Sequence, residues 1–158
     1  MSADDCDPRD RAAHDRDAHD RDTLARFVAA QDEGGTYARA VAELETGRKR
    51  SHWMWFVLPQ LRGLGRSAMA ERYGLDGRGE AEAYVRHPVL GPRLVAACRA
   101  LLAHPREPID AILGDIDAMK CRSCATLFAA VAPGEPVFRA VLDTFFAGED
   151  DPATLARL

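Results

Sequence analysis

The sequence predicts a mainly α-helical protein, a single compact multi-helix domain that follows a disordered N-terminal tail. Apolar residues recur at intervals of three and four through most of the 158 residues, and no segment alternates convincingly with the period of two that is typical of strands. Glycines and prolines separate the periodic segments. At this length, and with 29% charged residues, one domain with a substantial core is expected.

Residues 1–21 form the predicted tail, and the helical domain is expected to run over 22–158. The tail is acidic and contains histidine, repeats Ala-His-Asp-Arg-Asp in succession, and has almost nothing apolar to bury. Residues 1–22 hold eight Asp and four Arg, whereas the remainder has 17 acidic and 17 basic residues. The net charge of −4 therefore belongs to the N-terminus, and the neutral domain argues against nucleic acid as a partner.

The domain is expected to begin with an αα-hairpin. Asp22 or Thr23 can cap a first helix, which a pair of glycines ends, and Thr36 can cap a second helix, which Gly47 ends. The end of this hairpin delivers three consecutive basic residues, Arg48 to Arg50, to the central segment of the chain, 49–67.

Further helices are expected after the central segment, each bounded by a capping residue, a proline or a glycine. Ser67 can cap a short helix that ends at Tyr73. The remaining helices are predicted over 80–87, 90–104, 108–114, 116–132 and 136–147, with a final turn or two after Asp151. Within 116–132, Ile116 and Met119 fall in the 3.6-residue period, which assigns them to the apolar face.

The central segment differs from an ordinary core segment. It contains both tryptophans, Trp53 and Trp55, and Ser51–Leu61 has no charged residue, whereas basic residues stand at both of its ends. A buried apolar floor with a positive rim is typical of a site for an anionic, partly aromatic ligand. The two indoles share a face if the segment is extended and diverge if it is helical, so one indole is expected in the core while the other is free to stack on a ligand.

A glycine loop closes the central segment. Residues 63–68 fit G-x-G-x-x-A, the fingerprint of dinucleotide-binding folds, but no second strand of a βαβ unit follows, so a doubly wound fold is not expected. Backbone N–H groups at a capped helix start, flanked by Arg62 and Arg66, could instead hold a phosphate. The alternative is a tight turn before a helix.

The four cysteines do not indicate a disulfide framework or a metal site. Cys121 and Cys124 form a C-x-x-C that supplies only two ligands and lies within a predicted helix, so both are expected to be small helix residues, one or both buried. The longest uncharged stretch, Ser123–Gly134, has 12 residues, fewer than the roughly 18 of a membrane span. With no apolar leader either, a cytoplasmic protein without a membrane partner is expected.

The motif S-H-W-M-W-F-x-x-P-Q over 51–60, followed by G-L-G-x-S, resembles the signature of domain of unknown function 1810, a bacterial family of small helical proteins sometimes labelled calpastatin. The likeness extends over four further groups: Arg26-Phe27-Val28-x-x-Gln31, Asp117-x-x-Lys120, Thr126-Leu127-Phe128 and Asp151-x-x-Thr154-Leu155. More distantly, the chain resembles the NAD- and ADP-ribose-associated superfamily NADAR. The resemblance implies that Asp117 points toward the Trp53 cluster and is the functional carboxylate.

We therefore expect a domain that binds a nucleotide-like ligand of the NAD or ADP-ribose class, with no protein-bound cofactor or metal. If the domain is an enzyme, the expected reaction is hydrolysis of an N-glycosidic bond, in which Asp117 stabilises the cationic sugar and His52 assists the departing base. The residues expected to bind the ligand are Lys49, Ser51, Trp53, Trp55, Gln60, Arg62, Gly63, Gly65, Arg66, Ser67 and Lys120. The alternative is a non-enzymatic helical module that binds a protein partner.

Overall fold

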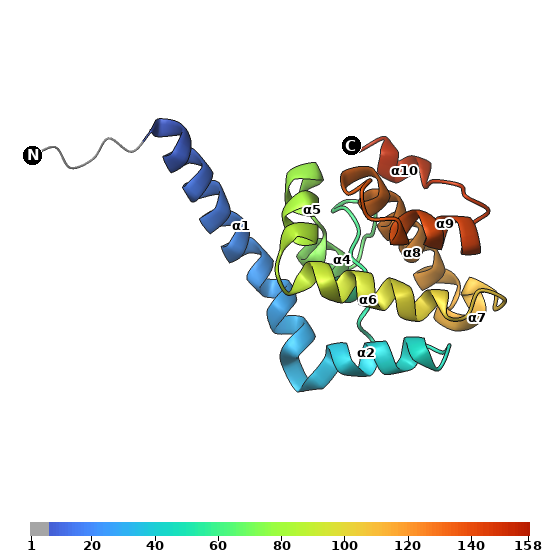
Figure 1. The fold of residues 1–158 in the computed structure, drawn as a ribbon. Coiled ribbons are helices and arrows are strands. Elements are labelled where there is room, and N and C mark those ends of the chain that lie inside the picture. The colour runs from blue at the N-terminus through green and yellow to red at the C-terminus, as the bar shows by residue number, and fades with distance from the viewer. Residues whose placement is uncertain (1–6) are drawn as a thin grey trace, which may run out of the picture.

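The computed structural model describes residues 7–158, which form α-helices joined by short connections (Figure 1). The helices are α1 (Pro8–Asp32), α2 (Thr36–Glu45), α3 (Met54–Val57), α4 (Ala68–Tyr73), α5 (Gly77–Arg86), α6 (Leu90–Leu102), α7 (Ile109–Leu113), α8 (Asp115–Val131), α9 (Val137–Phe145) and α10 (Pro152–Leu155), with a 3-10 turn at Glu33–Gly35. Over this range there is no strand beyond an isolated parallel bridge between Leu61 and Leu75. The prediction of a mainly α fold is confirmed.

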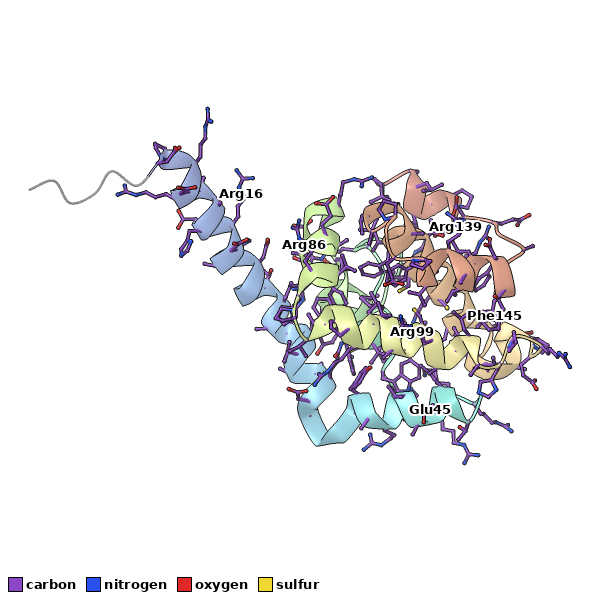
Figure 2. All side chains as sticks on the ribbon, in the orientation of Figure 1. Arg16, Glu45, Arg86, Arg99, Arg139 and Phe145 are labelled. Atoms are coloured by element: carbon purple, nitrogen blue, oxygen red, sulfur yellow. The ribbon has the colours of Figure 1, made fainter. Side chains whose placement is uncertain are left out.

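The first helix begins earlier than predicted. Asp7 precedes it and accepts a 2.9 Å hydrogen bond from the Arg9 amide, so the backbone from Pro8 onward is helical where a tail without structure was expected; residues 1–6 lie outside the described range. This half of α1 projects from the body, with Arg16 directed into solvent (Figures 1 and 2), and residues 7–19 are exposed. The segment therefore buries no apolar surface, as expected. It extends a helix that is already nucleated by its packed C-terminal half, and adding residues to an existing helix is easier than starting one.

The core is a chain of aromatic rings that connects four helices. The Phe27 ring of α1 meets Tyr84 of α5 at 5.1 Å between centroids, Tyr84 meets Phe128 of α8 at 5.6 Å, and Phe128 meets Phe138 of α9 at 5.5 Å. All four side chains are buried. Aromatic pairs at these separations contribute more than their buried area alone, so α8 is held at the centre of the domain.

Helix α6 lies across the body between α2 and α9 (Figure 1) and also packs on α5. Its approach to α5 requires Gly91, because a Cβ atom at this position would lie 2.2 Å from the carbonyl oxygen of Val85. In this way α6 connects the N-terminal hairpin to the C-terminal helices. No helix in the described part of the chain is long and apolar enough to cross a membrane.

The central segment contains a single helical turn, α3, followed by irregular chain with a tight turn at residues 62–63. The side-chain amide of Gln31, a buried residue of α1, donates to the Phe56 carbonyl at 2.8 Å and attaches this turn to α1. Beyond it, the Arg62 amide donates to Leu75 and the Leu75 amide donates to Gln60, both at 2.9 Å, which closes a loop around residues 63–74. This loop carries the glycines and α4.

Several predicted helix ends agree with the structure and others differ. Thr36 is the first residue of α2 and not its cap, because Gly35 takes the cap position with a left-handed backbone. Ser67 caps α4, since its Oγ accepts a 3.0 Å hydrogen bond from the Ala70 amide. Helix α5 begins at Gly77 instead of Glu80. Asp115 is the first residue of α8 and not its cap, because Gly114, with φ of 83°, makes the turn from α7.

Candidate functional site

Three charged side chains meet where the turn after α2 reaches the first turns of α8. Lys49 Nζ lies 3.0 Å from Asp117 Oδ2, and Lys120 Nζ lies 3.6 Å from Asp117 Oδ1. Their side chains are only 10%, 19% and 19% exposed for Lys49, Asp117 and Lys120. The Lys49 amide also donates to the Ile112 carbonyl at 2.8 Å, which attaches the turn to α7. The cluster holds two cations around one anion, and its excess charge is positive.

Each of the two lysines lies over an indole ring. Lys49 Nζ is 5.1 Å from the ring centroid of Trp53, and Lys120 Nζ is 4.9 Å from that of Trp55, within the range of cation–π attraction. Trp53 is completely buried, and Trp55 is partly exposed. Trp53 is thus the core indole that the sequence led us to expect, and it presents no surface on which a ligand could stack.

An open cleft of about 560 Å³, the Asp117 cleft, lies in front of this cluster. The polar and aromatic side chains that line it are Lys49, His52, Trp55, Asp115, Asp117 and Lys120. His52 and Asp117, the two residues predicted to do the chemistry, therefore face one cavity. His52 is exposed at the rim, whereas the neighbouring Trp53 is buried. The Nε1 of Trp55 is buried and has no acceptor among the described residues.

The turn that carries His52 is held from behind by Glu43, a buried residue of α2 that is 8% exposed. The Glu43 Oε1 accepts from the Arg50 amide at 2.8 Å and from the Ser51 amide at 2.6 Å. Both carboxylate oxygens accept from Ser51 Oγ, at 2.9 and 2.8 Å, and from Trp53 Nε1, at 3.4 and 3.3 Å. Burial raises the pKa of Glu43, but these donors outweigh it and bring the pKa below its ordinary value.

A second hollow of about 440 Å³, the α8 groove, lies beside the Asp117 cleft and shares Ile116 and Lys120 with it. Predicted ligand-binding residues in its lining are Gln60, Gly65, Arg66, Ser67 and Lys120. Its apolar wall includes Ile116 and Met119, which are 72% and 73% exposed. The sequence assigned both residues to the apolar face of α8. In the structure no helix covers this part of α8, so the two side chains are exposed and line the groove.

Four other predicted ligand-binding residues are directed elsewhere. Ser51 donates to Glu43 and Trp53 is buried, so both are occupied in holding the turn. Arg62 lies 3.7 Å from Glu71 and 4.0 Å from Asp76, outside the Asp117 cleft and the α8 groove. Gly63 has a carbonyl that accepts from Arg157 at 3.4 Å and does not line either hollow.

The C-x-x-C cysteines lie inside the domain. Cys121 and Cys124 are 3% and 2% exposed, and burial raises the pKa of both thiols above the ordinary value. Raised thiol pKa values disfavour the thiolate, which is the reactive and metal-binding form. The interpretation of these cysteines as small buried helix residues is confirmed.

Four charged residues near the site were missed: Asp115 lines the Asp117 cleft, Asp151 and Arg122 line the α8 groove, and Glu43 lies behind the cleft. Arg122 lines the α8 groove and donates to the carbonyls of Glu149 and Asp150, at 3.1 and 2.6 Å. Glu43 could have been noticed, because it lies in the sequence between Ala40 and Leu44, on the apolar face of a short amphipathic helix. A carboxylate at such a position requires several donors, and these come from the turn that follows.

The fold and the site define a compact helical domain with a tryptophan-lysine cleft at one end of its central helix. The chain belongs to the family described as "Protein of unknown function (DUF1810)", whose model matches residues 21–158. It is also similar to the crystal structure of the conserved hypothetical protein Rv1873 from Mycobacterium tuberculosis: the TM-score is 0.82 and the identity 44%, over 85% of this chain and 95% of that chain. The comparison with curated proteins gives no match. None of these comparisons shows the more distant NADAR likeness.

Proposed function

We propose that the Asp117 cleft binds a phosphate-bearing, nucleotide-like ligand of the NAD or ADP-ribose class. The observation that carries this proposal is the pairing of one carboxylate, Asp117, with two lysines that both line the cleft. The ammonium groups of Lys49 and Lys120 can each bind an anion, and Trp55 offers a partly exposed aromatic surface beside them; the carboxylates of Asp115 and Asp117 balance the charge of the free cleft. At about 560 Å³ the cleft has the size of typical small-molecule sites.

The ligand extends, in this proposal, toward the α8 groove, where Arg66 is exposed and Gln60 and Lys120 line the wall. Because Lys120 borders both hollows, it is the residue best placed to contact a phosphate between two parts of a ligand. The groove offers Arg66 and Lys120 as cations and Gln60 as a hydrogen-bonding amide.

Hydrolysis of an N-glycosidic bond is the reaction that this arrangement favours. In the free cleft two ammonium groups neutralise Asp117, which limits its effect on a cationic sugar. A phosphate that draws the lysines away leaves Asp117 to stabilise that charge. His52, which lines the same cleft, is the candidate acid for a neutral leaving base: it gives its proton to the base, water adds its hydroxyl to the sugar carbon, and the remaining proton of that water returns to His52. The cationic nicotinamide of NAD would leave as a neutral base without this proton.

Calorimetric titration of the full chain with ADP-ribose, NAD, ribose 5-phosphate and nicotinamide tests the binding proposal. The phosphate-bearing compounds should bind, and Lys120→Met should weaken them about tenfold or more, the effect of losing one charge-assisted hydrogen bond. Arg99→Met is the matched control, because Arg99 is an exposed cation of α6 outside both hollows (Figure 2). Equal affinities for all three proteins, or no binding at all, would contradict the proposal.

The second candidate function is a helical module that binds a protein partner, and the exposure of Ile116 and Met119 favours it. Large apolar side chains that lie together on a surface often mark an interface. The two candidates differ in one measurable respect. An interface predicts that Ile116→Ser with Met119→Ser abolishes partner binding while small anions leave the melting temperature unchanged, whereas the ligand proposal predicts a rise in melting temperature with ADP-ribose.

A further inference from the structure

Glu43 is buried behind the Asp117 cleft and lines neither the cleft nor the α8 groove. Its carboxylate accepts hydrogen bonds from the backbone of Arg50, from the backbone and hydroxyl of Ser51, and from the indole of Trp53. These donors lie on both sides of His52 in the sequence. A single buried anion therefore fixes the whole turn from Arg50 to Trp53 on α2.

The influence of Glu43 reaches the cleft through Ser51. The Ser51 carbonyl accepts a 2.6 Å hydrogen bond from Lys49 Nζ, and the same ammonium lies 3.0 Å from Asp117 Oδ2. An unbroken series of short polar contacts thus runs from Glu43 through Ser51 and Lys49 to Asp117. Every link after Glu43 depends on the position of the Ser51 peptide, which the carboxylate holds by its amide and its hydroxyl.

We infer that Glu43 is the positioning residue of the Asp117 cleft: through the Ser51 peptide it sets where Lys49 and His52 stand relative to Asp117. This inference rests on the proposed function, because a ligand in the cleft is what the positioning serves. Glu43 itself touches no ligand. Its role is to keep the Lys49 ammonium directed at Asp117 and the His52 side chain on the rim. Without the hydrogen bonds to Glu43, the turn from Arg50 to Trp53 would be free to move.

The Glu43→Gln variant separates positioning from folding. A glutamine of the same shape keeps one acceptor oxygen for the backbone amides but loses the negative charge that strengthens those hydrogen bonds. Its NH₂ group also faces Ser51 Oγ and the Trp53 indole, and the indole N–H can only donate. Glu80→Gln is the matched control, because Glu80 is an 11% exposed carboxylate that pairs with Arg26 at 2.6 Å, outside the cleft. Both variants lose one partly buried carboxylate, and only Glu43→Gln changes the turn.

Three measurements on the full chain test the inference. Amide hydrogen exchange needs no ligand, and in Glu43→Gln it should become about tenfold faster at Arg50 and Ser51 while the core amides of α8 keep their rates. The affinity for ADP-ribose, measured by titration calorimetry, should fall about tenfold in Glu43→Gln and stay at the wild-type value in Glu80→Gln. The indole N–H signal of Trp53 in a ¹⁵N spectrum should move in Glu43→Gln alone.

The inference is overturned if exchange at Arg50 and Ser51 is unchanged in Glu43→Gln, or if Glu80→Gln lowers the affinity equally. If the wild-type chain binds no ADP-ribose, the proposed function fails, and the exchange rates together with the Trp53 signal still decide whether Glu43 positions the turn. Uniformly faster exchange throughout Glu43→Gln would mark Glu43 as a general stabilising residue and would also overturn the positioning role.

Discussion

Lys49 and Asp117 are 68 residues apart in the sequence, yet the Lys49 ammonium lies 3.0 Å from the Asp117 carboxylate. One residue follows the N-terminal hairpin, and the other lies in the first turn of α8. The cleft is therefore a product of the tertiary fold, because its two sides meet only when α7 and α8 pack beside the turn after α2. The stability of this contact and the binding of ligand can be measured separately.

The Lys49–Asp117 pair should show measurable coupling. Both side chains are mostly buried, so a double-mutant cycle with Lys49→Met and Asp117→Asn should give a coupling of about 1 kcal/mol in the free energy of unfolding by urea. The matched cycle uses Arg139 and Asp150, which lie at the same 3.0 Å but are 47% and 36% exposed, and should give less than about 0.5 kcal/mol. Equal coupling in the two cycles would show that burial does not strengthen the cleft pair.

The two tryptophans should differ in their contribution to stability. Trp53→Phe leaves a cavity in the core and removes a donor from the buried Glu43, so it should lower the free energy of unfolding by about 2–4 kcal/mol. Trp55→Phe removes an N–H with no described acceptor from a partly exposed side chain and should cost about 1 kcal/mol or less. Urea denaturation of the two variants checks this order, and a larger loss for Trp55→Phe would be inconsistent with the structure.

Two carboxylates make the fold sensitive to acid. Burial alone raises the pKa of Glu43 and of Asp151, but hydrogen bonds from neighbouring donors, among them Ser51 for Glu43 and Thr154 and Ser123 for Asp151, bring both pKa values below the ordinary range. A group with a lowered pKa in the folded state adds stability above its unfolded pKa of about 4, and that stability is lost as the pH falls through the folded value. The melting temperature should therefore fall below about pH 4, and the fall should be shallower in Glu43→Gln. An unchanged acid slope in this variant would contradict the lowered pKa.

Two glycines offer a test of the packing between α5 and α6. Gly91→Ala places a methyl group 2.2 Å from the Val85 carbonyl oxygen and should cost about 3 kcal/mol or more. Gly79→Ala is the control, because no atom lies within 4 Å of its Cβ position and the residue is inside α5, where alanine is favoured by about 0.5–1 kcal/mol. Thermal unfolding should thus move in opposite directions for the two variants.

Local signals in the sequence were sufficient for most of the helices. Caps such as Ser67 and stops such as the glycine pair after α1 act within a few residues, so their effects can be predicted without a fold. The N-terminal half of α1 could not be predicted in this way, because its helix is continued from a half that packs on α5. The exposure of Ile116 and Met119 also escaped prediction, since periodicity defines an apolar face but not whether another helix covers it.

The sequence predicted which residues would form the site better than it predicted how their side chains are arranged. The motif around Trp53 and Trp55 and the Asp117-x-x-Lys120 pair correspond to the residues that meet at the cleft. The burial of Trp53 and the position of the turn before it depend on tertiary contacts with Glu43, and the direction of Arg62 depends on its pairing with Glu71 and Asp76. No spacing in the sequence encodes those contacts.

The most direct test of the central claim is a titration of the ¹⁵N-labelled full chain with ADP-ribose, followed by the two indole N–H signals. We expect the signal of Trp55, whose ring carries Lys120 at the edge of the cleft, to shift and saturate, whereas the signal of the buried Trp53 changes little, and Lys120→Met should reduce the response. Unchanged spectra at about 1 mM ADP-ribose would mean that any Kd lies well above about 1 mM. That result would contradict the assignment of the Asp117 cleft as a nucleotide-binding site.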